Sequence, residues 1–404
     1  MKVVPDELLE KPDNESHWGI AALLAALAMV SPFSLDTFYP SFAAISREFS
    51  LSIWQIQQSI TVYMVPFALM TLVQGPLSDA LGRRPVVLAG LLLYSCASIA
   101  CVFAPTFAVL LAFRAVQGMS AGVGMAVGRA IIRDLHEGPQ AQKLMSTITM
   151  IFSVAPAIAP VIGGWIHVWF GWRYVFGFMV MAGVSLMLLS YALLPETHPS
   201  ERRTRLHVGV LARTVLRIAA TPEFMAYALA LGITFAAMIT FIGAAPAVVM
   251  QHWHMRETQF WALFVPLICG ILGGAYVSGR LAGRLTGRRQ IAIGYTLSLF
   301  GAGLTLLLHA TTTPPVLVQQ VLITLIATGV QLMMPIFALR MLDLFPESRG
   351  SAASVQSCVM LGTGAVFIGG LVPAISGSML TLSAGSFLAA LTGFVIWHLA
   401  WRQD

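Results

Sequence analysis

The sequence predicts an all-α integral membrane protein with twelve transmembrane helices in two pseudo-symmetric six-helix bundles. The first observation is composition, because 57% of the 404 residues are hydrophobic and only 10% are charged, whereas a soluble domain carries about 25% charged residues. The second is length, because one spanning helix with a short loop takes roughly 30–35 residues, so about twelve fit. The third is a loop motif that recurs in both halves of the chain. This composition excludes an ordinary cytosolic enzyme, a disordered chain and a secreted disulfide-rich scaffold.

Apolar runs bounded by proline, glycine or charge define the spans. In chain order they cover residues 18–42, 53–76, 85–104, 107–132, 144–167, 172–194, 223–249, 258–280, 290–309, 315–340, 351–374 and 379–401. We expect every run to be helical, because backbone groups inside a bilayer must bond within their own segment. A polar, acidic N-terminal tail, residues 1–17, precedes the first run, which is too long for the apolar part of a signal peptide.

Lysine and arginine are distributed unevenly between the loops on the two sides. One side carries Arg47, Arg173 and Arg256. The other carries Lys2, Lys11, Arg83, Arg84, Arg133, Lys143, Arg202, Arg203, Arg205, Arg213, Arg217, Arg280, Arg284, Arg288, Arg289, Arg340, Arg349 and Arg402. Because basic loops stay in the cytoplasm, we expect both termini inside, in a bacterial inner membrane. The net charge of +6 therefore reflects topology, and no nucleic-acid partner is expected.

The longest connection divides the chain into two halves. We place an N-terminal bundle at residues 18–195, a basic cytoplasmic linker at 196–221 and a C-terminal bundle at 222–404. Arginines alternate with valines and leucines between residues 208 and 217. This pattern predicts an amphipathic helix on the inner membrane surface, and a plain basic tether is the alternative. Paired six-helix halves are a transporter plan with the substrate site between them.

A loop motif recurs at the same place in both halves. After the second span the chain reads Gly75-Pro-Leu-Ser-Asp79-Ala-Leu-Gly82-Arg83-Arg84, and after the eighth it reads Gly279-Arg-Leu-Ala-Gly283-Arg-Leu-Thr-Gly287-Arg288-Arg289. Gly75 lets helices approach closely and Gly82 permits a tight turn. Asp79 can accept hydrogen bonds from amides at a helix start, and Arg83 can pair with Asp134. We expect such a cluster to close the inner side and to break when the halves move.

Asp36 is the one acidic residue within an apolar run. A carboxylate at membrane depth is costly unless it is paired, protonated or hydrated, so it is a candidate for binding and releasing protons. The alternative places it at the outer interface. Arg114, seven residues into the fourth span, is the matching cation and needs a partner such as Asp36, a substrate oxygen or backbone carbonyls. Gln117 can share its role, and the alternative for Arg114 is a brace within the N-terminal half.

Soft and aromatic side chains of several spans could line an adaptable substrate cavity. The candidates, besides Asp36, Arg114 and Gln117, are Tyr39, Tyr63, Met119, Phe235 and Met238. The chain contains no Walker loop, nucleophile elbow or metal-ligand motif. We therefore expect no enzyme activity, no metal and no cofactor, with energy supplied by an ion gradient.

Four motifs together resemble the major facilitator superfamily over essentially the whole chain. The stretch Gly75–Pro85 resembles its loop 2–3 signature, and Leu111–Gly118 resembles its span-four arginine motif. The fifth span, with Pro156, Pro160, Gly163 and Gly164, is similar to its antiporter motif and suits a bent helix between the halves. Leu35–Pro40 looks like the span-one motif of the twelve-helix drug:proton antiporters, especially the Bcr/CflA and MdfA-like branch.

The resemblance implies roles for individual residues. In such antiporters the span-one aspartate is protonated in competition with substrate and the span-four arginine lies nearby, which implies proton coupling by Asp36 and Arg114. The resemblance also implies gating roles for Asp79, Arg83 and Asp134. Gly75, Gly82 and Arg84 are the other residues of the gating motif. The sequence departs from the family at Ala155 and Ala159, where the antiporter motif has glycine, and at Ala28, where MdfA-like relatives have a second acid.

We expect a monomeric, proton-coupled exporter of small amphiphilic compounds that works by alternating access. Its partners are then the substrate, protons and the lipid bilayer. Two alternatives stay open at this point. One is a proton symporter that imports a small metabolite, and the other is a membrane sensor that does not transport.

Overall fold

The computed structural model describes residues 14–136, 138–203 and 207–401, and every element assigned in those ranges is helical. Eleven helices are long and apolar enough to cross a membrane, and the bent pair α3–α4 brings the number to twelve. The predicted all-helical fold with twelve spans is confirmed.

Six spans form the N-terminal half. They are α1 (Asn14–Asp36), followed by η2 (Tyr39–Ser41) and α2 (Phe42–Glu48); α3 (Ile53–Met70) with α4 (Gln74–Leu81); α5 (Arg83–Val102); α6 (Phe107–Ala121) with α7 (Val123–Leu135); α8 (Gly138–Phe170); and α9 (Trp172–Leu193). The short η3 (Ser200–Arg202) and α10 (Val208–Ala219) follow in the connection.

Six further spans form the C-terminal half. They are α11 (Pro222–Gly243) with the π-helical η4 (Ala247–His252); α12 (Trp261–Leu281); α13 (Gly287–Thr311); α14 (Val316–Asp343); α15 (Arg349–Val366), preceded by η5 (Pro346–Ser348) and followed by the π-helical η6 (Phe367–Leu371) and α16 (Val372–Ile375); and α17 (Met379–Trp401).

Several predicted spans are interrupted where the chain carries proline or glycine. The α-helix of the first span ends at Asp36 and not at residue 42, because Pro40 has no N–H to donate to the Asp36 carbonyl. The second span bends by 51° between α3 and α4. The fourth breaks at Gly122, where a side chain would collide with Phe67 and Gln74 of α3 and α4. These breaks are local, and each span still crosses the bundle.

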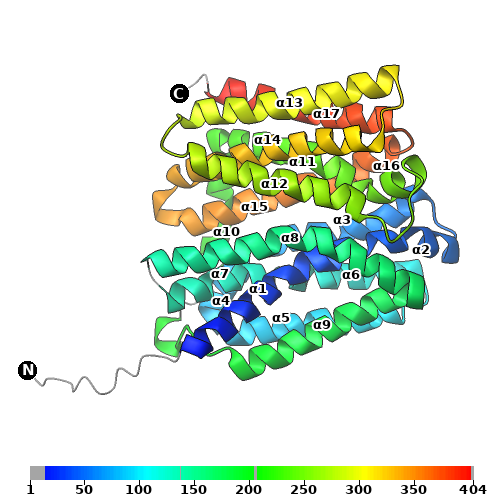
Figure 1. Cartoon of the computed structure of the whole chain (residues 1–404). Helices are drawn as coiled ribbons and strands as arrows, with labels where there is room; N and C mark the ends of the chain where they lie inside the picture. Colours follow the sequence, from blue (N-terminus) through cyan, green and yellow to red (C-terminus); the bar gives the residue numbers. More distant parts are fainter. Residues whose placement is uncertain (1–13, 137, 204–206, 402–404) are drawn as a thin grey trace, which may run out of the picture.

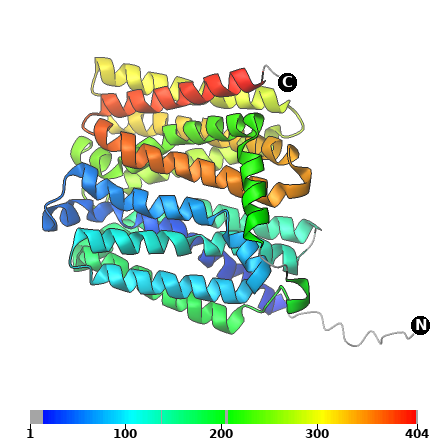
Figure 2. The same ribbon diagram turned by 180° about the vertical axis from the view of Figure 1, so that it is seen from behind.

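The two halves lie side by side, and α1 begins at the same end of the molecule at which α17 ends (Figure 1). We call this the termini end and the other the opposite end. The turn between α2 and α3 and the loop between η4 and α12 lie at the opposite end. The predicted helix in the connection is α10, which crosses from one half to the other at the termini end (Figure 2). Ile218 of α10 is buried, whereas Val208 and Leu216 are exposed.

The halves share a hydrophobic core at one end, whereas at the other end their cores are separate apart from Leu72 of the N-terminal half, which packs against the C-terminal core. At the opposite end a single cluster contains Tyr39 and Ile56 of the N-terminal half together with Phe241 and Phe264 of the C-terminal half. At the termini end the N-terminal half has a cluster of its own around Val87 and Val127, and the C-terminal half has another around Tyr227 and Phe337. The halves are therefore packed into one body at the opposite end and have separate cores at the termini end.

Candidate functional site

Asp36 ends α1 inside the first apolar span and is buried, with 7% of its surface exposed. Within the described residues it makes no hydrogen bond and no ion pair. The residues that follow Asp36 contact both halves of the molecule. Gly163 of α8, in the N-terminal half, packs against the Thr37 carbonyl. The ring centroid of Tyr39 lies 6.2 Å from that of Phe264 in the C-terminal half. The predicted acid is thus a buried, unpaired carboxyl beside the surface at which the halves meet.

Arg114 lies deeper, within the N-terminal half, and is completely buried. Its Nη1 donates to the Ser34 carbonyl and to Gln117 Oε1, both at 3.0 Å. Its guanidinium carbon lies 4.9 Å from the Phe38 ring centroid and 4.5 Å from that of Tyr63, a cation–π arrangement that partly replaces lost hydration. Nε and Nη2 have no hydrogen-bond partner among the described residues.

Gln117 extends this group across the N-terminal bundle. Its Nε2 donates to Ser98 Oγ of α5 at 2.7 Å and lies 3.8 Å from Met179 Sδ of α9. The side chains of α6 are thereby tied to α1, α5 and α9. Of the partners predicted for Arg114, the structure contains a backbone carbonyl and not Asp36. Arg114 braces α1 just before that acid without forming an ion pair with it.

The other predicted cavity residues divide into two groups. Tyr39 and Tyr63 are buried near Arg114, and Tyr39 interacts electrostatically with both Arg114 and Asp36. Met238 of α11 belongs to the shared core, and Phe235 packs against it. Met119, the remaining predicted residue, is 41% exposed. It shares its face of α6 with the exposed Ala112, since positions seven apart lie on the same helix face.

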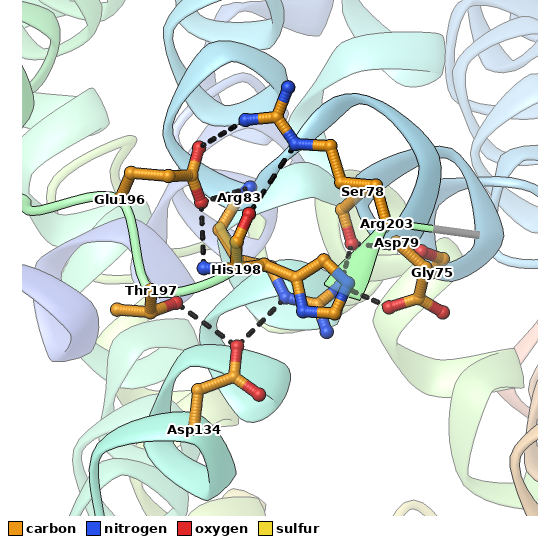
Figure 3. Close-up of polar contacts among 9 residues, drawn as sticks. All are labelled: Gly75, Ser78, Asp79, Arg83, Asp134, Glu196, Thr197, His198 and Arg203. Atoms are coloured by element: carbon orange, nitrogen blue, oxygen red, sulfur yellow. Dashed lines mark hydrogen bonds and ion pairs between the residues drawn. The ribbon is translucent and has the colours of Figure 1, made fainter. Parts of the chain in front are cut away.

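A polar cluster surrounds Arg83 at the start of α5 (Figure 3). Its Nη1 donates to Asp79 of α4 and, at 2.6 Å, to Ser78 Oγ, while Nε donates to Asp134 Oδ2 of α7 at 3.0 Å. Thr197 Oγ1 donates to the same Asp134 oxygen at 3.0 Å. Arg83 contacts Asp134, the acid that the sequence analysis suggested for it, whereas Asp79, expected to accept from amides at a helix start, accepts from the Arg83 side chain. All of these contacts lie within the N-terminal half, so here the cluster braces one half and does not bridge to the other, and its gating role stays a prediction.

The segment after α9 completes the cluster. Glu196 Oε1 accepts hydrogen bonds from the backbone N–H groups of Arg83 and His198, both at 2.9 Å, and Glu196 Oε2 lies 3.6 Å from Arg203 Nη2 (Figure 3). Gly82 has φ +100°, and a Cβ there would collide with the Glu196 carboxylate. Sequence reasoning missed Glu196, because its partner is a backbone amide more than a hundred residues away and no spacing reveals such a contact.

The remaining residues of the motif hold the turn in place. Ser78 Oγ also donates to the Gly75 carbonyl at 2.8 Å. Arg84 Nη2 donates to the Tyr191 carbonyl at 2.6 Å, and its guanidinium lies 5.2 Å from the Tyr191 ring centroid. The start of α5 is thus fastened to the end of α9.

The second copy of the loop motif has a different environment. Arg280, Arg284, Arg288 and Arg289 are all exposed, and within the described residues none of them forms an ion pair. Arg280 stacks on Tyr276, with 5.1 Å between the guanidinium carbon and the ring centroid. This turn also contains a glycine with positive φ, but it is Gly283, at +73°, and not Gly287, which corresponds to Gly82 in the sequence motif.

The fifth span is one continuous helix, α8, that contains Pro156 and Pro160. Gly163 allows α1 to approach closely at Thr37, and Gly164 allows the Glu257 carbonyl of the other half to do so, since a Cβ at either glycine would collide with those atoms. The glycines of the predicted antiporter motif therefore lie where α8 meets both α1 and the C-terminal half. Among the residues the structure describes, no group of His, Cys, Asp and Glu is arranged to hold a metal.

Comparison with known proteins places these features in a family. The family model described as Major Facilitator Superfamily matches residues 24–370. The chain is 28% identical to an uncharacterized MFS-type transporter, YdgK, of Bacillus subtilis over 96% of each chain. It is 29% identical to a bicyclomycin resistance protein homolog of Haemophilus influenzae over 71% of this chain and 72% of that protein.

Solved structures agree on the fold. A bacterial homolog of the human lysosomal transporter Spinster matches with a TM-score of 0.71 at 15% identity, over 97% of this chain and 98% of that one. The human organic anion transporter MFSD10 matches with a TM-score of 0.67 at 18% identity, over 95% and 99% of the two chains. At these identities the likeness concerns the arrangement of helices alone.

Proposed function

Since this chain belongs to the Major Facilitator Superfamily, and is a multi-pass membrane transporter and not an enzyme, we propose that it exports small amphiphilic compounds in exchange for protons, with Asp36 as the coupling acid. The names of its relatives support export. Besides the bicyclomycin resistance protein homolog, the chain is 32% identical to multidrug resistance protein D of Escherichia coli over 48% of this chain and 49% of that protein.

The observation that carries the proposal is the environment of Asp36. The other acids of the described residues lie in loops or at helix ends, whereas Asp36 lies within the apolar span Gly19–Glu48, is buried and has no partner there. A carboxyl without a fixed counter-charge changes its protonation with whatever occupies the space beside it. Substrate and proton can therefore compete at this position.

The packing of the halves supports alternating access. The core is shared at the opposite end and divided at the termini end. With both termini in the cytoplasm, as the charge distribution predicts, this is the arrangement of a transporter whose site is reached from inside. Rocking of residues 18–195 against 222–404 would transfer the access to the other side, where the lower pH protonates Asp36 and releases the substrate.

Arg114 has a supporting part in this proposal. Its hydrogen bond to the Ser34 carbonyl fixes the last turn of α1 before Asp36, and its guanidinium carbon lies 4.9 Å from the ring centroid of Phe38, the residue before Tyr39. Direct contact with substrate would require the N-terminal bundle to open, because Arg114 is fully enclosed in this structure. We therefore assign Arg114 the positioning of the acid and of Tyr39.

The test is transport in inverted membrane vesicles, driven by an imposed pH gradient. We expect Asp36→Asn to lose accumulation of a fluorescent amphiphilic dye down to the level of vesicles without the protein, and Asp36→Glu, which keeps a carboxyl, to retain part of it. Asp343→Asn is the matched control, because Asp343 is an exposed acid paired with Arg349. Undiminished gradient-driven transport by Asp36→Asn would refute the coupling role, and movement of solute in the same direction as protons would identify a symporter instead.

A further inference from the structure

The helix α3 donates hydrogen bonds across the seam between the halves. At the opposite end, Gln58 Nε2 donates to the Gly369 carbonyl at 3.0 Å, and Gln57 Nε2 lies 3.4 Å from the Gly243 carbonyl. Just after the end of α3, Thr71 Oγ1 lies 3.5 Å from the Ser354 carbonyl. The shortest of these contacts, and so the strongest by geometry, is that of Gln58.

The Gly369 carbonyl is available because of the local sequence. In an α-helix it would accept from the N–H of residue 373, which is Pro373 and has none. The chain here forms the π-helical η6, Phe367–Leu371, between α15 and α16, and such π-helical turns often mark functional positions within helices. The Gln58 amide thus supplies a donor to a carbonyl that its own helix has left without its usual α-helical partner.

The two helices meet closely at this point. Gly369 is buried, and a Cβ there would collide with the side chain of Thr61, one turn beyond Gln58 on α3. Thr61 Oγ1 is itself buried with no hydrogen-bond partner among the described residues, and so is Gln57 Oε1. Polar atoms left unsatisfied at a packed seam cost free energy, and separation of the helices would allow water to reach them.

We propose that Gln58, bonded to the Gly369 carbonyl, is the latch that holds the opposite end closed, and that η6 is the part of the C-terminal half released when the latch opens. The inference rests on the proposed function only in requiring that the halves rock. It concerns the equilibrium between the two conformations and not the chemistry of Asp36. Loss of one such hydrogen bond changes an equilibrium by about three- to tenfold.

The experiment measures the distance between the halves at the opposite end. Spin labels are attached to Phe103→Cys at the end of α5 and Thr312→Cys after α13, both exposed positions, in a background whose four native cysteines are replaced. We expect Gln58→Leu to raise the ratio of long to short distances about three- to tenfold. Gln320→Leu is the matched control, because Gln320 Nε2 donates to the Ala262 carbonyl at 2.7 Å within the C-terminal half, and its distances should match those of the wild type.

Two further variants test the same contact between α3 and η6 without changing the Gln58 amide. Gly369→Ala should open the seam because its methyl group collides with Thr61. Thr61→Ala added to it removes the two outer atoms of that side chain, Oγ1 and Cγ2, and should restore part of the short distance. Wild-type distances in both Gln58→Leu and Gly369→Ala would overturn the latch. The measurement needs neither substrate nor a pH gradient, so a failure of the coupling role of Asp36 would leave its outcome unchanged.

Discussion

The two copies of the loop motif begin from the same sequence signal and end in opposite electrostatic environments. In the N-terminal copy, Arg83 is buried between Asp79 and Asp134. In the C-terminal copy, the position that corresponds to Asp79 is Gly283, and the exposed arginines around it have no ion pair among the described residues. Both copies keep a glycine with positive φ at the turn. The backbone turn is therefore common to the two halves, whereas the ion-pair network belongs to one.

The difference teaches what the shared residues are for. Glycine at the turn is required by the backbone in both loops. We expect the arginines to serve topology in both, because basic loops stay on the cytoplasmic side. Only where acids from α4, α7 and the segment after α9 converge does an arginine become part of the packed structure. The asymmetry predicts that equivalent substitutions in the two copies have unequal effects on stability.

The largest difference in stability is expected between substitutions of Arg83 and Arg288, which occupy equivalent positions in the two copies of the motif. Arg83→Ala leaves Asp79 and Asp134 without their cation, and breaking a buried pair from one side is strongly destabilising. Because both acids are partly exposed, we expect a loss of about 2–3 kcal/mol in the free energy of unfolding. Arg288→Ala should change it by less than about 0.5 kcal/mol, as for an exposed side chain without a partner.

Equilibrium unfolding in detergent micelles measures both variants. Equal destabilisation by the two substitutions would show that the acids around Arg83 contribute nothing to stability. Adding Asp79→Asn and Asp134→Asn to Arg83→Ala should recover part of the lost stability, because these two carboxylates are the groups that Arg83→Ala leaves without a cation.

A smaller difference in stability is expected between alanine substitutions of the two turn glycines, Gly82 and Gly283. Gly283→Ala should cost about 1 kcal/mol, because an L-residue is strained at positive φ. Gly82→Ala is strained as well, because φ 100° with ψ 155° lies in a region that is essentially restricted to glycine. It also places its methyl group against the Glu196 carboxylate, so we expect about 2 kcal/mol. The same unfolding measurement compares them, and a Gly82→Ala variant no less stable than Gly283→Ala would contradict the close contact with Glu196.

Much of the architecture was predictable from the sequence, because the bilayer imposes strong rules on it. Twelve apolar runs and a motif repeated in both halves predicted the fold, and the family match confirms the superfamily. The internal breaks were not predicted. Gly122 and Pro373 look like ordinary membrane-helix residues in the sequence. The packing of α3 against its neighbours shows what the irregular chain accommodates at both places.

The candidate site was predictable in part. Charged residues deep in apolar runs are easily recognised in a sequence, so Asp36 and Arg114 were predicted. The pairing of Arg83 with Asp134 was suggested by the loop motif. Whether two buried charges touch depends on side-chain direction, which spacing does not supply. Arg114 turns to the Ser34 carbonyl and not to Asp36.

The smallest expected effect concerns Glu196, the residue that sequence reasoning missed. Glu196→Gln keeps an oxygen for the N–H groups of Arg83 and His198 but removes the charge that strengthens those bonds and attracts Arg203. We expect a loss of about 1 kcal/mol in the free energy of unfolding, because charged hydrogen bonds exceed neutral ones by roughly that amount. The control in the other half is Asp343→Asn, which breaks an exposed pair with Arg349 and should cost less than about 0.5 kcal/mol. The measurement is equilibrium unfolding of the two variants in micelles. If Glu196→Gln loses no more stability than Asp343→Asn, the charge of Glu196 does not stabilise the α5 turn. The electrostatic difference between the halves is then confined to Arg83 and its two aspartates.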